Sequence, residues 1–365
     1  MLPHNIRRLI HRALALAIVT VAAVVAVGEL VAAEPPVVAD DAWCSPPPKA
    51  GGNVVLKAVL VEDQNQQPQA AGKAAAEALK QAMGGVPLKA VILSECFEDK
   101  PAKLKLLEGI ASVLPADILL GGATYGSFTQ AGCSDLDAVS LLGIGGDGIS
   151  VAAGLATEMG TSKLVFEEHQ PEIERRLHAA GAKLAGKLRQ TKLDRLLILI
   201  PDAHSPKNQF IVEGAQQVVG GQFPITGGCV NKNAGQTFVC FRGRLYEDSA
   251  VALMLSGELR VSLAGRQAKE NDQVISTARE AAAEAAARLK TRPIAALAFD
   301  CAGRKGKLKN VADELAAVQQ AIGKELPLFG CYCAGEIGPL DVSEKRPGIL
   351  SGGGGWHVMV TLIGQ

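Results

Sequence analysis

The stretch "LPLFGCYCAGEIGPL", Leu326–Leu340, joins an apolar run to a glycine-rich turn that carries one acid, Glu336. The same pattern occurs twice earlier in the chain, in "ADILLGGATYGSF" and in "FPITGGCVNKNAG". A short apolar run bounded by glycines is typical of a buried strand, and glycines allow close approach of backbone. The three stretches therefore predict one strand-to-turn element present in three copies.

Working outward, each copy is preceded by another apolar strand, a polar turn and a helix, and is followed by a closing strand. The preceding strands are "AVILSECFE", "RLLILIPDAHS" and "IAALAFDCAGR". From Ser94 to Gly121, from Asp202 to Gly227 and from Asp300 to Gly330 there are 27, 25 and 30 residues, a spacing that suits a helical crossover between parallel neighbours. We predict an α/β fold of mixed sheets built from repeated β-α-β-β units, with helices packed on the sheets.

The segments around these copies add further elements. A strand over 54–61 and a helix that ends at Gly84 and Gly85 precede the first copy. "LVFEEHQPEIERRLHAAGAKLAGKLRQ", between copies one and two, predicts a strand followed by a long helix. An alanine-rich helix lies between copies two and three, and we place a domain boundary near 257–272, which gives domains over 53–260 and 261–365.

The composition limits the classes of function. Apolar residues make up 48% of the 365 residues, aromatic residues only 4%, and the formal net charge is zero. The core is therefore built mainly from Ala, Val, Leu and Ile. Because no strongly basic face is implied, nucleic acid is a poor candidate for a partner.

The N-terminus has the pattern of a targeting segment. Basic residues in "NIRRLIHR" precede a 15-residue apolar run, and "VAA" ends at Ala33. This pattern predicts a signal peptide over 1–33, cleaved near Ala33, followed by a flexible Pro- and Gly-rich leader over 34–52. The protein would then be exported to the periplasm or the extracellular space. The alternative is an uncleaved anchor, although the run is shorter than the roughly 20 residues that span a bilayer.

Eight cysteines follow the predicted signal peptide, and export would permit disulfides whose pairing the sequence does not give. Cys331 and Cys333 would point to the same face of a strand. A metal site and a redox pair are both alternatives at this motif. However, structural zinc sites usually combine C-x₂₋₄-C with a second ligand pair, which is missing. We expect one of the two cysteines to lie in the core and the other to line a cleft, with no metal or cofactor.

Two further motifs indicate enzymatic alternatives. "GIGGDG" (143–148) satisfies G-x-G-x-x-G, with Glu167 near the place of a ribose-binding acid, although the following "ISVAAGL" resembles a strand as much as a helix. "PDAHSPKN" places Asp202, His204 and Ser205 at the end of a strand. A catalytic triad is assembled in space, not along consecutive residues, so this segment is more typical of a loop at the mouth of a pocket.

Loops that follow parallel strands are where α/β proteins bind ligands. If the three copies stack, their loops converge on shared rims. Arg304 and Glu336 would then hold the carboxylate and the ammonium of a small zwitterion, or would form an ion pair with each other. Tyr332 and Asn231 lie in the same loops. The predicted ligand-binding residues are Thr124, Tyr125, Asn208, Cys229, Cys301, Arg304, Cys333, Gly335 and Glu336.

"FDCAGR", followed about thirty residues later by "GCYCAGEIGP", resembles the C-terminal FIST domain. "DILLGGATYGSF", "PITGGCV" and "GRLYEDSAVALML" resemble the N-terminal FIST domain, so 53–260 is FIST N-like and 261–365 is a shortened FIST C-like domain. The resemblance covers nearly the whole chain after the leader. The residues at the family's signature positions are Cys301, Arg304, Gly335, Glu336 and Pro339.

The resemblance implies a sensory module of signal transduction that binds a small ligand, for which amino acids or similar metabolites are expected. No catalytic residues carry over. We expect an exported protein that binds a small polar metabolite reversibly, without catalysis, and acts on a separate signalling protein. The alternative is an enzyme with a cysteine nucleophile or a nicotinamide cofactor. No nucleic acid and no membrane association beyond the signal peptide are expected.

Overall fold

The computed structural model describes residues 41–134, 137–188, 191–233 and 236–365. The predicted signal peptide and the beginning of the leader lie outside these residues. Residues 41–365 form one compact unit by contact. None of the helices in the described part of the chain has the length and apolar character of a membrane span.

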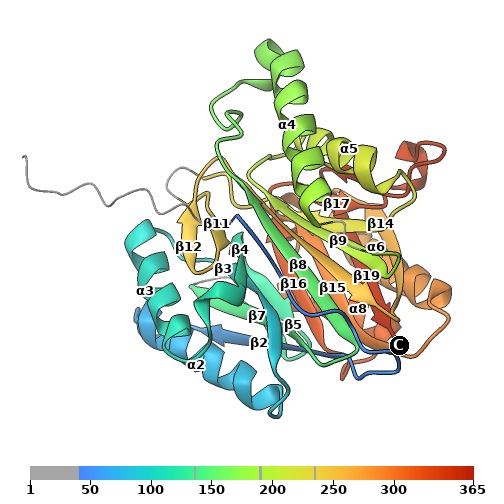
Figure 1. The fold of residues 1–365 in the computed structure, drawn as a ribbon. Coiled ribbons are helices and arrows are strands. Elements are labelled where there is room, and N and C mark those ends of the chain that lie inside the picture. Colours follow the sequence, from blue (N-terminus) through green and yellow to red (C-terminus); the bar gives the residue numbers. More distant parts are fainter. Residues whose placement is uncertain (1–40, 135–136, 189–190, 234–235) are drawn as a thin grey trace, which may run out of the picture. The chain divides into compact units, whose positions relative to one another are not determined.

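Three units of the same design follow one another in the chain (Figure 1). The first unit comprises β2 (Val55–Glu62), α2 (Pro68–Ala82), β3 (Leu88–Glu95), α3 (Lys100–Ala111), η1 (Ala116–Ile118), β4 (Leu119–Ala123), β5 (Ser127–Thr129), β6 (Gly132–Ser134) and β7 (Ala138–Gly145). The second unit comprises β8 (Ile149–Ala156), α4 (Phe166–Leu188), β9 (Asp194–Pro201), α5 (Asn208–Val219), β10 (Ile225–Gly228), β11 (Val239–Phe241), β12 (Arg244–Tyr246) and β13 (Ala250–Gly257). The third unit comprises β14 (Arg260–Gln267), α6 (Asn271–Arg288), β15 (Pro293–Cys301), α7 (Ala302–Lys305), α8 (Val311–Ile322), β16 (Leu328–Cys333), β17 (Glu336–Gly338), η2 (Val342–Glu344), β18 (Gly352–Gly354) and β19 (His357–Gly364).

Each unit forms a mixed sheet in which two strands are parallel and the others antiparallel. In the first unit β3 and β4 are parallel, and β7 runs antiparallel to both β2 and β3. The pairs β9–β10 and β15–β16 repeat the parallel arrangement. The predicted fold class, mixed sheets from repeated β-α-β-β units, is confirmed. The repeat is longer than the sequence pattern suggested, because β2, β8 and β14 each open a unit.

The units are interlocked by exchange of short hairpins. The hairpin β11–β12 of the second unit extends the first unit's sheet beside β4. The pair β17–β18 of the third unit extends the second unit's sheet beside β10, and β5–β6 of the first unit extends the third unit's sheet beside β16. Every unit thus gives one hairpin and receives another, in cyclic order.

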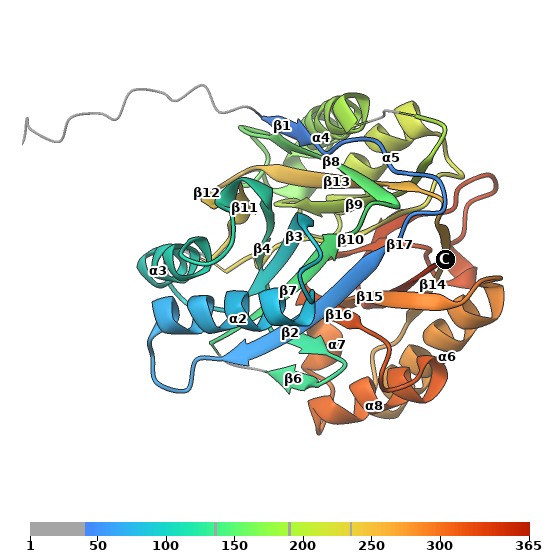
Figure 2. The ribbon, with the colours of Figure 1, turned by 60° about the horizontal axis from the view of Figure 1, so that its bottom comes forward.

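The core has an inner part and three outer parts. Apolar side chains from all three sheets, including Ile92, Leu253 and Leu297, meet in one inner cluster. The outer face of each sheet is covered by a helix pair: α2 with α3, α4 with α5, and α6 with α8. The three helix pairs form separate groups in Figures 1 and 2. Since helices cover one face and other sheets the opposite face, the strands have the continuous apolar character seen in the sequence.

Two local expectations differ from the structure. Lys163–Val165 are not a strand, because β8 already opens the second unit and Phe166 begins α4. Ala42–Cys44, within the predicted flexible leader, form β1, which pairs with the exposed edge of β8. Trp43 explains the attachment, since its ring lies 5.0 Å from that of Phe241 and packs against the inner core.

Candidate functional site

The turns after β4, β10 and β16 meet and are joined by backbone hydrogen bonds in a closed cycle. Tyr125 N donates to Tyr332 O (2.9 Å), Cys229 N donates to Gly335 O (2.8 Å), and Asn231 N donates to Ala123 O (2.8 Å). The turn of each unit is therefore bonded to the strand end of another unit. The convergence of the three loops, expected from the sequence if the copies stack, is observed.

Thr124 and Tyr125 lie where the first unit meets the third. Thr124 is buried, and its hydroxyl lies 2.8 Å from that of Ser94, which also lies 2.8 Å from the Ser127 hydroxyl. The Tyr125 hydroxyl donates to Asn233 Oδ1 (3.3 Å) at the surface, and burial raises the pKa of this phenol. Thr124 is therefore part of the interior, whereas Tyr125 reaches solvent.

Asn208, Cys229 and Gly335 lie where the second unit meets the third. Asn208 is fully buried, and its Nδ2 donates to Glu336 O (3.0 Å) and to Gly354 O (2.9 Å). Gly335 has a φ of +153°, and an added Cβ there would lie 2.9 Å from Asn208 Nδ2. Asn208, Cys229 and Gly335, which the sequence predicted to share one site, do lie together. However, protein atoms pack closely around them.

Glu336 is fully buried beside this junction. Its Oε2 accepts a hydrogen bond from His357 N (3.0 Å), while its Oε1 has no donor among the described residues. Burial holds the pKa of this carboxyl well above its usual range, and the hydrogen bond from His357 opposes this only in part. Burial therefore favours the protonated form of Glu336.

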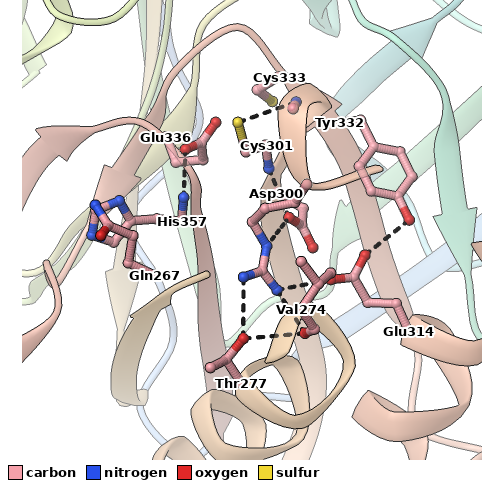
Figure 3. Close-up of polar contacts among 12 residues, drawn as sticks. Gln267, Val274, Thr277, Asp300, Cys301, Glu314, Tyr332, Cys333, Glu336 and His357 are labelled. Carbon is pink, nitrogen blue, oxygen red and sulfur yellow. Dashed lines mark hydrogen bonds and ion pairs between the residues drawn. The ribbon is translucent and has the colours of Figure 1, made fainter. Parts of the chain in front are cut away.

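Arg304 is the centre of a separate buried network on α7. Its Nε donates to Asp300 Oδ1 (2.8 Å), and its Nη2 donates to Glu314 Oε1 (2.8 Å) and to Val274 O (2.9 Å). Its Nη1 donates to Thr277 Oγ1 (3.1 Å). Figure 3 shows these partners converging from three elements. Arg304 therefore binds Asp300 and Glu314 rather than Glu336, and every nitrogen of its fully buried guanidinium bonds a protein group.

The two carboxyls of this network, those of Asp300 and Glu314, are buried. Burial raises the pKa of Asp300 and raises that of Glu314 well above its usual range, and Arg304 opposes both shifts. The Tyr332 hydroxyl donates to Glu314 Oε2 (3.2 Å). Asp300 and Glu314 share one cation, so protonation of one of them lowers the electrostatic cost of the cluster.

Five of the eight cysteines, including Cys229, Cys301, Cys331 and Cys333, are buried in the core. No cysteine in the described part of the chain forms a disulfide, and the Sγ atoms of Cys331 and Cys333 lie 3.6 Å apart on one face of β16. Burial raises the pKa of Cys301 to about 12 and that of Cys229 well above its usual range. The hydrogen bond with Cys331, followed by burial, has the same effect on the pKa of Cys333. A nucleophile requires a thiolate, which these surroundings disfavour.

The motifs "GIGGDG" and "PDAHSPKN" also include closely packed turns. Gly143 and Gly145 lie in β7, and Gly148 lies in the turn to β8, so "GIGGDG" opens a strand and not the helix that a dinucleotide fingerprint requires. His204 Nε2 lies 3.1 Å from Asp202 Oδ1, and Ser205 N donates to Ala334 O (3.0 Å). The segment that begins at Asp202 is therefore packed where the second unit meets the third.

An open cavity of about 720 Å³ lies between the first and the third unit, beside β6 and α7. We call it the junction cavity. Its lining residues are Glu62, Asp63, Gln64, Tyr125, Cys133, Ser134, Asp137, Ala302, Lys305, Gly306, Leu308, Lys309, Asn310 and Val311.

The two walls of the junction cavity carry opposite charges. The third unit contributes Lys305 and Lys309, and the first unit contributes Glu62, Asp63 and Asp137. The Lys305 ammonium donates to Tyr125 O (2.6 Å) and lies 5.4 Å from the centre of the Tyr332 ring. Of the nine predicted ligand-binding residues, only Tyr125 lines this cavity. For the lining residues that were not predicted, the one signal in the sequence was the position of Lys305, directly after the signature residue Arg304.

Comparison with known proteins places these features in a family. The FIST N domain matches residues 89–271, and the FIST C domain matches residues 239–339. No curated protein matches the chain. Among solved structures, the chain is similar to cyanuric acid hydrolase from A. caulinodans, with 10% identity, 85% of this chain and 99% of that chain covered, and a TM-score of 0.42. It is also similar to PurLQS from Thermotoga maritima, with 9% identity, 85% and 72% coverage, and a TM-score of 0.29.

Proposed function

The chain belongs to the FIST family, whose domains are sensory domains of signal transduction, and we propose that it is a sensor that binds a small amino-acid-like metabolite reversibly in the junction cavity. The observation that carries this proposal is the separation of charge across the cavity, with lysines on one wall and carboxylates on the other. A free amino acid has the complementary pair of charges.

In this proposal each wall of the cavity has a role. The ammonium groups of Lys305 and Lys309 would hold the ligand carboxylate, and Asp63 and Asp137 would hold its ammonium through charge-assisted hydrogen bonds. Tyr125, between the walls, offers a half-buried ring and a hydroxyl. Because Lys305 directly follows Arg304, the lysine wall is fixed to the buried network of Asp300 and Glu314.

Binding without chemical change agrees with the state of the buried thiols. Burial raises the pKa of Cys96, next to the carboxylate-bearing wall, to about 11, and that of Cys301 to about 12. Both groups are therefore thiols at neutral pH, and neither is activated for attack on a ligand. The cavity offers fixed charges to a bound molecule, which suits recognition.

Export and a separate signalling partner are part of the same proposal. Export rests on the basic and apolar pattern of 1–33, which is typical of a signal peptide, and an exported sensor would act on a separate signalling protein. Mass spectrometry of the protein isolated from its native host tests cleavage. We expect a mature N-terminus at or near Glu34; a chain that retains Met1–Ala33 would contradict cleavage and favour the uncleaved anchor.

Isothermal titration of the purified mature protein with a panel of L-amino acids tests the binding function. At least one amino acid should bind, and at a hundred times its Kd it should stabilise the fold by about 2.7 kcal/mol. Lys309 is exposed, so Lys309→Gln should leave the fold intact while it weakens binding by about three- to tenfold.

Lys307→Gln is the matched control, because Lys307 lies in the same loop and is exposed but does not line the cavity. It should bind as the unmodified protein does. If no amino acid binds, or if the two variants weaken binding equally, the junction cavity is not the ligand site.

A further inference from the structure

A second hollow of about 390 Å³ adjoins the junction cavity, and Asp63 and Asp137 line both. We call it the side hollow. Asp63 N donates to Asp137 O (2.7 Å), so the two acids are held together on the shared wall. The two cavities therefore share these two acids.

The side hollow combines apolar and acidic surface. Pro68, Phe97 and Pro101 supply apolar contacts, and Glu98 and Asp99 bring two further carboxylates. Lys105 is the one basic residue among its lining residues. Such a surface suits an aliphatic chain that ends in a positive charge.

Two observations bear on the charge of these carboxylates. The Oδ2 atom of Asp63 is shielded from solvent and has no hydrogen-bond donor in the described part of the chain, whereas its Oδ1 accepts from Gln67 N (2.8 Å). Burial, followed by the charges of Glu98 and Asp63, raises the pKa of Asp137. The buried Lys103 opposes this shift, but its ammonium is bound to Glu95 (2.7 Å).

We propose that the ligand is a cationic amino acid such as lysine, ornithine or arginine, with its carboxylate at Lys305 and Lys309 and its side-chain cation in the side hollow. This inference rests on the proposed function, because it assumes that the junction cavity holds the α-carboxylate and the α-ammonium. The aliphatic part of the side chain would contact Phe97. The terminal cation would lie near Glu98 and Asp63.

The test is titration of the mature protein with L-lysine and L-ornithine against L-norleucine, which has a similar aliphatic chain without the terminal charge. We expect L-lysine to bind at least about tenfold more tightly than L-norleucine, which corresponds to about 1.4 kcal/mol. Equal affinities would overturn the inference while leaving the proposed function intact. Absence of binding by every amino acid would overturn both.

Variants of the side hollow separate the charge effect from loss of folding. Glu98 is exposed, so Glu98→Gln should fold normally, reduce the preference for L-lysine at least threefold and leave the affinity for L-norleucine unchanged. Glu108→Gln, an exposed site outside both cavities, should keep the full preference. If Glu98→Gln keeps the full preference as well, the side hollow does not recognise the side-chain cation of the ligand.

A diamine tests whether the α-carboxylate is needed. Cadaverine keeps two amines but lacks the carboxylate that Lys305 and Lys309 would bind. It should therefore bind at least tenfold more weakly than L-lysine. Binding as tight as that of L-lysine would overturn the placement of the carboxylate at the lysine wall, and with it the amino-acid class.

Discussion

Arg304 is a fully buried cation whose partners are all provided by the protein. It binds Asp300 from the end of β15 and Glu314 from α8, and it also bonds two groups of α6, Val274 O and Thr277 Oγ1. Removal of one member of such a network leaves buried charges without compensation. The residue therefore holds α6, α7 and α8 to the third sheet and does not line the junction cavity.

Arg304→Met should lower the free energy of unfolding by about 3–5 kcal/mol, because two buried carboxyls lose their cation. Urea denaturation followed by circular dichroism measures the change. Arg279→Ala, an exposed arginine on α6, should change stability by less than about 0.5 kcal/mol. A loss below 1 kcal/mol in Arg304→Met would show that the network contributes little.

Glu336 makes stability depend on pH in a defined direction. Its pKa in the folded state is raised by burial, so the folded chain favours the protonated form. The stabilisation is complete below the unfolded-state pKa of about 4.3 and is lost as pH rises toward the folded-state pKa. Asp300 and Glu314 add dependence of the same sign.

Glu336→Gln imitates the protonated acid and should remove its share of this dependence. Between pH 5 and pH 8 the unmodified protein should lose stability relative to the variant, by at most about 1.4 kcal/mol per pH unit. Denaturation curves at several pH values measure the difference. Glu108→Gln should follow the unmodified protein, and parallel curves for Glu336→Gln would show that Glu336 is ionised in the fold.

In the first two copies, the neighbouring strand explains the first glycine of the Gly-Gly pair. Gly121 and Gly227 lie in β4 and β10 with φ of +148° and +153°. An added Cβ would overlap the carbonyl oxygen of Leu93 or Leu199 on the parallel neighbour. In the third copy Gly330 instead gives room to the ring of Phe128, which comes from the exchanged hairpin β5–β6. The glycine serves strand packing in two copies and hairpin docking in the third.

Gly227→Ala should therefore be strongly destabilising, by roughly 3 kcal/mol or more, because strained backbone and steric overlap act together. Gly186→Ala is the contrasting variant, since Gly186 is exposed in α4 with no neighbour within 4 Å. It should stabilise the protein by roughly 0.5–1 kcal/mol, because alanine favours a helix. Thermal denaturation compares the two; a mild effect of Gly227→Ala would mean that β9 and β10 readily separate.

The exchange of hairpins makes the three units mutually dependent. The third sheet contains β5 and β6 from the first unit, and the second sheet contains β17 and β18 from the third. The inner core is also shared, since its side chains come from all three sheets. No unit has a complete sheet or a complete core from its own residues.

We therefore expect one cooperative unfolding transition for the whole chain. A fragment over 53–260 would lack β17 and β18, and a fragment over 261–365 would lack β5 and β6. Neither should show cooperative urea unfolding or slow amide exchange by itself. Co-expression of the two fragments should restore both; independent folding of either fragment would show that its own core suffices.

The sequence by itself determined the repeat. Glycine-ended strands at Gly121, Gly227 and Gly330 and their even spacing from the preceding strands sufficed for the mixed α/β class. It also predicted the meeting of the three turns, because loops at equivalent strand ends of equivalent units face the same region. "FDCAGR" and "GCYCAGEIGP" identified the family, since these motifs record local backbone requirements that are written in consecutive residues.

Only the tertiary structure decided which polar residues face a cavity. Arg304 and Glu336 were expected to hold the ligand, yet both are fully buried, while Lys305 and Lys309 line the junction cavity. A one-residue step along the short helix α7 changes the direction of a side chain, and the sequence did not mark that helix. Asp63 and Asp137 lie far from Lys305 in the chain and meet it across two units. The exchange of hairpins that creates this junction depends on contacts between distant segments, which no local pattern specifies.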